Sequence, residues 1–505
     1  MNSRNQYFEA ADWLVIAAYL VGIILFGLWF GKDQKNTRDY FLGSKSIPWW
    51  GVGLSIIATE TSALTFIGVP ALAYGTNLGF IQIIVGYVIA RIVLAIVLVP
   101  HYFKGEIYSP YQLFSNTFGP PARRTAAGFF LMAGTLAAGV RVYVTCIPIK
   151  LMLRTDKWVP GSDGILLAIL LFVGLSLIYT YVGGIKAVVW TDAVQFVLFM
   201  AGGVFTLLYI PQLLDGGFRA VFDQAGKGGK LEWLNLHFSL ALPYNLWMGI
   251  VGGTVHVLSS HGADQLLVQR VLTCKSVADG RKALLLSAAI IFPLFLIFLL
   301  TGSMLWVYYQ QFPPAIPIPE TTAGISKNDY IYPIFILTAV PPVLKGFLIV
   351  AILSAAMSSV SSALSALASV STMDLIKGLS RAERSEKDFL KFSRYSTVYW
   401  AAALVVVAYA SREVPFVLNA AFALTGLTSG ALLGGLLTAL FTKKGSAAPV
   451  IAGMFASLTV MIGIQLKTNV AWPWFTLIGA TVTVLVALVA PGILFHKKRG
   501  VEPPN

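Results

Sequence analysis

The sequence predicts an all-α protein that crosses a membrane many times. Of its 505 residues, 57% are hydrophobic and only 11% are charged, whereas soluble domains carry about 25% charged residues. Apolar stretches of about 20 residues, the length that crosses a bilayer as a helix, recur from residue 11 to residue 496. These stretches leave no room for a separate soluble domain, so we expect residues 1–505 to form a single membrane domain.

Thirteen helical segments are predicted from the apolar runs and from the Gly, Pro and charged residues between them. They cover residues 11–31, 50–75, 78–103, 124–153, 164–182, 187–211, 241–262, 282–309, 329–373, 394–411, 414–442, 448–466 and 472–496. The first segment lacks a preceding basic region and a following cleavage site, so we expect a retained helix rather than a signal peptide. The ninth is too long for one crossing, and a short external helix is expected before a membrane helix that starts near Val343.

The positive charges predict the orientation in the membrane. With the N-terminus outside and the C-terminus in the cytoplasm, 23 Lys and Arg residues fall in inner loops and 9 in outer ones, as the positive-inside rule requires. The formal charge of +14 is thereby explained without nucleic acid as a partner. We therefore expect a multi-pass protein of the inner cell membrane.

A polar cluster lies at the middle of the second predicted helix, formed by Ser55, Thr59, Glu60, Thr61, Ser62 and Thr65. An ionisable group inside a bilayer costs at least a few kcal/mol, so Glu60 is a functional candidate. Helices broken at this depth expose carbonyl groups to cations and amide groups to solutes. Packing between helices by small hydroxyl residues is the alternative, but it does not account for Glu60.

Further polar residues lie inside other predicted spans. Ala355, Ser358, Ser359 and Ser362 share one helix face, and their oxygens are hard, neutral ligands that suit Na⁺. Asp192 could supply negative charge to a bound cation or could simply favour its helix N-terminus. Arg91 and Arg141 are mid-span cations, for which a structural ion pair is the alternative to a functional role.

No pattern of an enzyme is found. The five histidines are scattered, and neither a Walker A sequence for ATP nor a nucleophile elbow occurs. Cys146 and Cys274 lie far apart without metal-ligand spacing. Any energy for transport must then come from an ion gradient, unless transport is passive.

The chain resembles the sodium/solute symporter family over essentially its whole length. The most specific matches are residues 39–43, 179–184 with 190–192, 264–270, and the Ser-rich stretch that ends at Asp374. The resemblance implies a leucine-transporter-like fold with two inverted five-helix repeats, about 50–211 and 241–442, with helix 11–31 before them and two helices within 448–496 after them. It also implies alternating-access uptake of a small polar or anionic solute, such as a sugar, sialic acid or other carboxylate, driven by Na⁺. A proton-coupled symporter and a passive facilitator of the same fold are the alternatives.

The resemblance further implies sites for the ions and the solute. A sodium site falls on Ala58, Thr61, Ala355, Ser358 and Ser359, and a second one on Asp192, Ser358, Ser361 and Ser362. The solute pocket falls on Glu60, Ser62, Thr65, Gln82, Arg141, His256 and Ser260. Arg141 matches the arginine with which sialic acid carriers grip a carboxylate, whereas Glu60 departs from their small hydroxyl residue. If Glu60 pairs with Arg141, a sugar or zwitterion becomes as plausible as an acid. We expect a monomer whose partners are solute, sodium ions and the lipid bilayer.

Overall fold

The computed structural model describes residues 7–105, 107–153, 155, 158, 164–318, 320, 328–377, 385–413, 417–442 and 445–495. The described chain is helical almost throughout. Its first half contains α1 (Ala10–Trp29), α2 (Thr37–Leu42), α3 (Trp49–Glu60), α4 (Ala63–Gly75), α5 (Ile81–Val93), α6 (Val99–Tyr102), α7 (Tyr111–Phe118), α8 (Pro120–Leu153), α9 (Ile165–Tyr209) and α10 (Gly217–Lys227). The second half contains α11 (Thr254–Gly262), α12 (Gln265–Leu272), α13 (Val277–Gln311), α14 (Ile331–Ala339), α15 (Leu344–Val370), α17 (Glu386–Ala410), α18 (Val417–Phe441), α19 (Ala447–Lys467) and α20 (Phe475–Phe495).

Each of the thirteen predicted segments contains a helix. By length and composition, eight helices among the described residues can cross a membrane, and nine can if α3 and α4, which are bent by 59° relative to each other, count as one broken span. The remaining four segments are the second part of α9, then the π-helix Met248–Gly253 together with α11, then α17, and finally α18. The long ninth segment divides as expected, into the short α14 and the long α15.

The helix α9 is two predicted segments joined at Gly184. This glycine has a φ of +56°, and a Cβ there would lie 2.7 Å from the carbonyl oxygen of Tyr40. Tyr179 donates to the carbonyl of Met357, and Asp192 contacts the neighbouring Ser358. A continuous helix would hold Tyr179 and Asp192 about 20 Å apart, so the chain reverses at Gly184.

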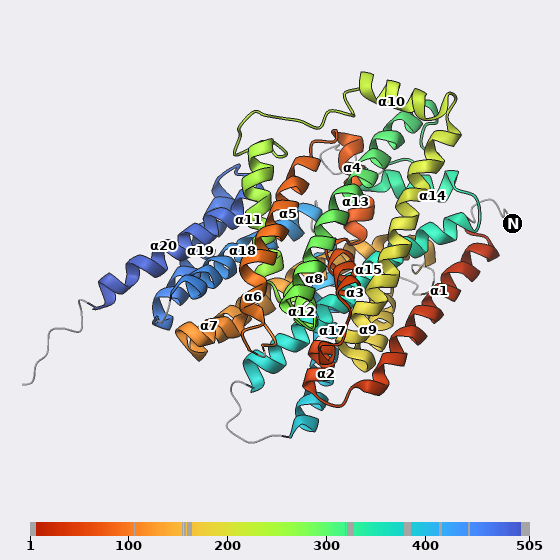
Figure 1. Cartoon of the computed structure of the whole chain (residues 1–505). Coiled ribbons are helices and arrows are strands. Elements are labelled where there is room, and N and C mark those ends of the chain that lie inside the picture. The colour runs from red at the N-terminus through yellow and green to blue at the C-terminus, as the bar shows by residue number, and fades with distance from the viewer. Residues whose placement is uncertain are drawn as a thin grey trace, which may run out of the picture.

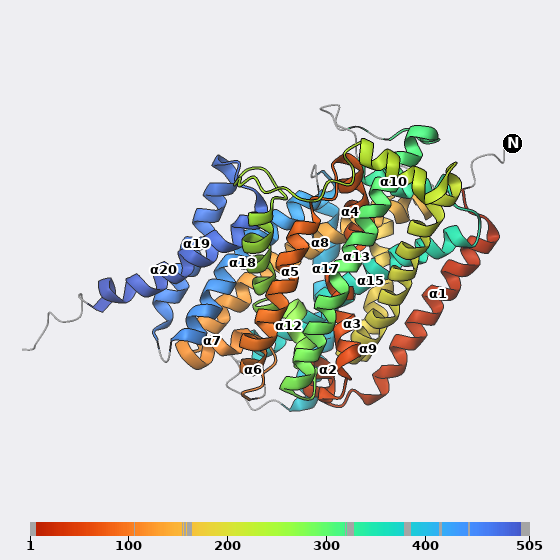
Figure 2. The same cartoon turned by 45° about the horizontal axis from the view of Figure 1, so that its top comes forward.

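The helix α15 forms the centre of the bundle. It is buried along almost its whole length and packs against α1, α3, α8, α9 and α17, because apolar residues and small serines occur on all its sides. Figure 1 shows α1 at one edge of the molecule and α19 and α20 at the opposite edge. In Figure 2, α10 lies across one end of the bundle, close to α4 and α13. The polar residues of α15 therefore lie deep inside the protein.

Candidate functional site: a broken helix beside a buried cavity

The second predicted helix is broken in its polar cluster. Helix α3 ends at Glu60, Thr61 is extended, and Ser62 caps α4 by accepting a hydrogen bond of 3.2 Å from the Leu64 amide. The Ser62 amide donates to the Thr65 hydroxyl at 3.3 Å. In an unbroken helix that amide would donate to the Ala58 carbonyl. The break therefore leaves the Ala58 carbonyl without its helical partner.

The break lies beside the serines of α15. The hydroxyl oxygens of Thr59 and Ser362 are 3.3 Å apart, and Ser62 and Ser359 line the same cavity. The Thr61 hydroxyl donates to the Ile57 carbonyl at 2.7 Å. The Ser359 hydroxyl donates to the Ala355 carbonyl at 3.1 Å. A hydroxyl that donates its proton keeps its lone pairs, so the residues of the first expected sodium site can still offer oxygen ligands.

Asp192 is the centre of a fully buried polar network. Its Oδ1 accepts from Ser358 at 2.7 Å, and its Oδ2 accepts from Ser55 at 2.6 Å. The Thr59 hydroxyl lies 3.4 Å from Oδ2. These contacts to other helices are not explained by a simple preference of Asp192 for its helix N-terminus.

The network brings together three residues of the second expected sodium site: Ser358 bonds Asp192 directly, and Ser362 is linked to Asp192 through Arg270 and Thr59. Nη2 of Arg270 lies 3.4 Å from Asp192 Oδ2 and contacts the Ser362 hydroxyl. The fourth expected residue, Ser361, donates to the Ser358 carbonyl at 3.1 Å.

The charge pattern counts Arg270 among the 23 cations of inner loops, but the structure places it on α12 and fully buries it. Its only sequence signal was its place in the motif 264–270 of the family resemblance.

Glu60 pairs with Arg91 rather than with Arg141. Nη2 of Arg91 contacts Glu60 Oε2, and Nε2 of His261 lies 3.6 Å from the same oxygen. Arg91 is fully buried and also donates to Ser287 at 3.1 Å and to the Tyr87 carbonyl at 3.0 Å. Arg91 thus compensates the negative charge of Glu60, and the Glu60 side chain still lines a cavity.

Two adjoining cavities lie between the broken helix, α8 and α11. They share seven lining residues: Ser62, Arg141, His256, Ser260, Asp264, Leu266 and Thr425. The larger one has about 1200 Å³ of empty space, partly open to solvent, and is also lined by Glu60, Thr65, Tyr87, Tyr244 and Trp472. Six of the seven expected solute residues therefore line one continuous space.

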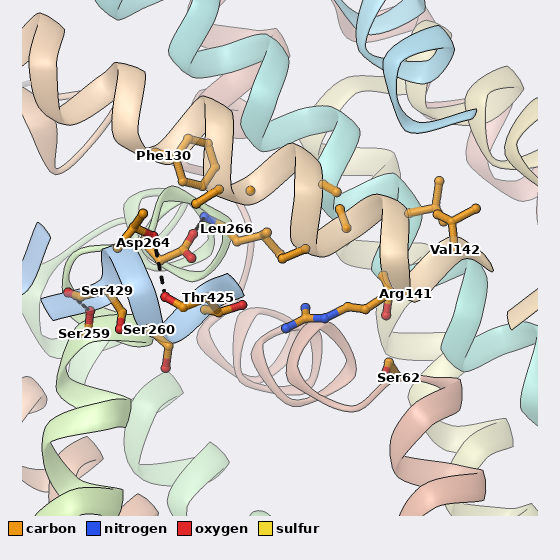
Figure 3. Close-up of a pocket in the computed structure, with 18 of the residues that line it drawn as sticks. Ser62, Phe130, Arg141, Val142, Ser259, Ser260, Asp264, Leu266, Thr425 and Ser429 are labelled. Carbon is orange, nitrogen blue, oxygen red and sulfur yellow. Dashed lines mark hydrogen bonds between the residues drawn. The ribbon is translucent and has the colours of Figure 1, made fainter. Parts of the chain in front are cut away.

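Arg141 holds the central position in this space. Figure 3 shows its guanidinium extending from α8 across the pocket toward Thr425, with Ser62 on one side. Arg141 takes part in none of the ion pairs formed between described residues. Asp264, which no sequence argument placed here, lines both cavities. Its carboxylate caps α12 by accepting from the Leu266 amide at 2.8 Å.

Gln82 is the expected solute residue that the structure does not bring to the cavity. Its amide nitrogen donates to the carbonyls of Gly79 and Tyr244 at 3.1 and 2.9 Å, and its oxygen accepts from the Asn235 amide at 3.0 Å. Both polar atoms of its side chain are thus occupied, and two of the three hydrogen bonds hold the segment 235–244 beside α5. Tyr244 and Trp472 line the cavity instead, and nothing in the sequence singled them out.

Comparison with known proteins identifies the family to which the chain belongs. A family model described as the sodium:solute symporter family matches residues 40–457. The chain belongs to this family. It is 27% identical to the sodium/sialic acid symporter SiaT of Proteus mirabilis, over 97% of each chain. It is 28% identical to the sodium/sialic acid symporter NanT of Aliivibrio fischeri, over 96% of this chain and 94% of that protein. It is also 28% identical to the human sodium/iodide cotransporter, over 92% of this chain and 71% of that protein.

Solved structures show the same architecture. A Na⁺-coupled sialic acid symporter in a substrate-bound outward-open state matches with a TM-score of 0.86 and 26% identity, over 96% of this chain and 98% of that one. The nucleobase-cation symporter Mhp1 in a closed conformation matches in fold alone, with a TM-score of 0.57 and 13% identity, over 93% of this chain and 97% of that one.

The protein is a sodium-coupled solute symporter with a leucine-transporter-like fold, and Na⁺ is its co-substrate. Membership in a transporter family confirms that it is not an enzyme. It also favours sodium coupling over the proton-coupled and passive alternatives.

Proposed function

We propose that this symporter carries an organic anion with a carboxylate group, which Arg141 binds. The observation that carries this proposal is that Arg141 faces both cavities and pairs with no carboxylate of the described residues, whereas Arg91 already compensates Glu60. The Arg141 guanidinium is half-buried and forms no ion pair with the described residues, so an anionic ligand would stabilise it. Its planar fork suits a carboxylate through two parallel hydrogen bonds.

The other lining residues support the same class of solute. Ser62, Thr65, His256 and Ser260 offer hydrogen bonds around Arg141. The related proteins are named for sialic acid, iodide and monocarboxylates, all of which are anions at neutral pH. A neutral sugar would give Arg141 no partner for an ion pair.

Two sodium ions per transport cycle form the second part of the proposal. We assign the first ion to Ala58, Thr61, Ala355, Ser358 and Ser359, and the second to Asp192, Ser358, Ser361 and Ser362. The first set contacts the break between α3 and α4, so sodium there would order the wall of the solute cavity. Each ion that moves inward through 100 mV releases about 2.3 kcal/mol, and a tenfold gradient adds about 1.4 kcal/mol. Two ions can therefore drive strong accumulation.

The test measures binding and uptake with purified protein in Na⁺ and in K⁺. N-acetylneuraminate, lactate and glucose serve as probes, because a ligand of the folded state raises the melting temperature. We expect the acids to stabilise the protein only in Na⁺. Arg141→Gln should weaken binding of the stabilising acid about 10- to 100-fold, because hydrogen bonds to charged groups contribute about 1.5–3 kcal/mol.

Arg124→Gln is the matched control, since Arg124 lies on the same helix but is exposed. An equal loss in both variants, or stabilisation by glucose alone, would contradict the carboxylate proposal. Uptake that ignores the replacement of Na⁺ by K⁺ would contradict the proposed sodium sites.

A further inference from the structure

The second proposed sodium site contains a positive charge that belongs to the protein. Arg270, near the end of α12, is fully buried, and its Nη2 lies 3.4 Å from Asp192 Oδ2. The same nitrogen contacts the hydroxyl of Ser362. Asp192 and Ser362 both belong to the second proposed site. The guanidinium therefore contacts two of the groups that would bind the second ion.

The Arg270 guanidinium forms a short hydrogen bond within its own helix and only a long one to Asp192. Nη1 donates to the Leu266 carbonyl at 2.6 Å. The 3.4 Å contact with Asp192 is long, since charge-assisted hydrogen bonds measure about 2.7–2.9 Å. Nε is buried without a hydrogen-bond partner among the described residues. Arg270 can therefore leave Asp192 without losing the contact that ties it to α12.

The charges do not allow both cations to occupy the site at low cost. Asp192 and Arg270 neutralise each other, and the other partners of Asp192, Ser55, Thr59 and Ser358, are neutral. A sodium ion added beside Asp192 would place two cations against one carboxylate inside the buried network, which is unfavourable. Sodium therefore binds Asp192 well only when Arg270 withdraws.

The helix α12 connects this network to the solute cavity. It begins after Asp264, and Asp264 and Leu266 both line the two cavities. It packs against α3 and α15, the helices that carry the proposed sodium ligands, and it lies in the middle of the bundle in Figure 2. A shift of this eight-residue helix when solute binds would move Arg270 relative to Asp192.

We propose that Arg270 is a tethered cation that competes with the second sodium ion for Asp192, and that α12 links this exchange to the solute. Arg270 is in this sense a positioning residue, because it touches neither the solute cavity nor the transported anion. The inference rests on the second sodium site of the proposed function.

The experiment titrates Na⁺ into the full-length protein at constant ionic strength, with choline as the replacing cation. Tryptophan fluorescence and melting temperature are followed with and without N-acetylneuraminate. In Arg270→Gln the sodium concentration at half-saturation should fall about tenfold, within the usual range for coupled sites, because the competing charge is gone. The effect of N-acetylneuraminate on sodium affinity, present in the wild type, should largely disappear. Arg281→Gln, at an exposed position at the start of α13, should behave as the wild type does.

Two further variants make the outcomes distinct. Asp192→Asn should remove one sodium component, and an unchanged titration in that variant would overturn the second site and with it this inference. If Asp192→Asn behaves as expected but Arg270→Gln has the half-saturation of the wild type, only the tethered cation is overturned. Should Arg270→Gln not fold, the double variant Asp192→Asn/Arg270→Gln carries no unpaired charge. It should have the sodium half-saturation of Asp192→Asn, because Arg270 acts on sodium only through Asp192, and a different half-saturation would overturn the tethered cation.

Discussion

At the scale of single residues, the mid-span charges divide into compensated and uncompensated ones. Arg91 is surrounded by Glu60, Ser287 and the Tyr87 carbonyl, so its role is to hold the carboxylate at the edge of the cavity. Arg141 has no such set of partners among the described residues. Both arginines lie inside predicted spans, and they differ in the partners that the tertiary structure gives them.

The Glu60 and Arg91 pair can be tested by a double-mutant cycle. Arg91→Gln leaves a carboxylate without its cation and should lower the free energy of unfolding by about 3–5 kcal/mol. Glu60→Gln/Arg91→Gln should recover much of this loss, because no charge remains unpaired. Equilibrium unfolding in mixed detergent micelles measures both values. A double variant as unstable as the sum of the single variants would show that the two residues do not interact.

At the scale of elements, close backbone packing positions the cavity wall. The helix α5 meets the π-helix Met248–Gly253 at Gly86, where an added Cβ would collide with the Gly249 carbonyl oxygen and lie 2.7 Å from the Thr254 amide. The Thr254 hydroxyl donates to the Gly86 carbonyl at 3.2 Å. Small residues allow this approach between membrane helices, and α11, with His256 and Ser260, follows directly from the contact.

Gly86→Ala should therefore destabilise the protein by about 1–3 kcal/mol or more, because backbone atoms cannot move away singly. Gly174→Ala is the matched control, since a Cβ at Gly174 has no neighbour within 4 Å. Alanine there should be neutral or stabilise α9 by up to about 1 kcal/mol. Thermal unfolding of both variants in detergent measures the difference, and equal melting temperatures would refute the packing argument.

At the scale of the whole molecule, we propose an N-terminus outside and a cytoplasmic C-terminus in the inner membrane. The asymmetry of positive loops supports this orientation even without Arg270. The cavity and both proposed sodium sites are built by one chain, so we propose the monomer as the transporting unit. The halves 50–211 and 241–442 stay a proposal for the two repeats, and both contribute to the cavity through α3, α4 and α11.

The orientation can be tested by labelling introduced cysteines. Cys146 and Cys274 are fully buried and should not react. Asp223→Cys on α10 and Lys275→Cys before α13 are exposed positions. On intact cells an impermeant maleimide should label Asp223→Cys at once and Lys275→Cys only after permeabilisation. The opposite order would reverse the proposed orientation.

The sequence by itself determined that this protein is a helical membrane protein with a polar break in its second helix. These features are local: the bilayer demands long apolar helices whose backbone groups are satisfied internally, and a polar cluster such as the one around Glu60 is visible within one span. The separate segments 164–182 and 187–211 on either side of Gly184, and the division of α14 from α15, were also predicted, because they too depend on local sequence.

Only the tertiary structure decided which charges meet. Glu60 pairs with Arg91 and not with Arg141. Arg270, counted among the loop cations, contacts Asp192 inside the bundle. Gln82, expected in the solute cavity, bonds the segment after α10. The partners lie 31, 78 and 162 residues apart in the chain. Their pairing follows from how the helices pack and from the cost of leaving a buried polar group unpaired, and neither can be read from the pattern of a single span.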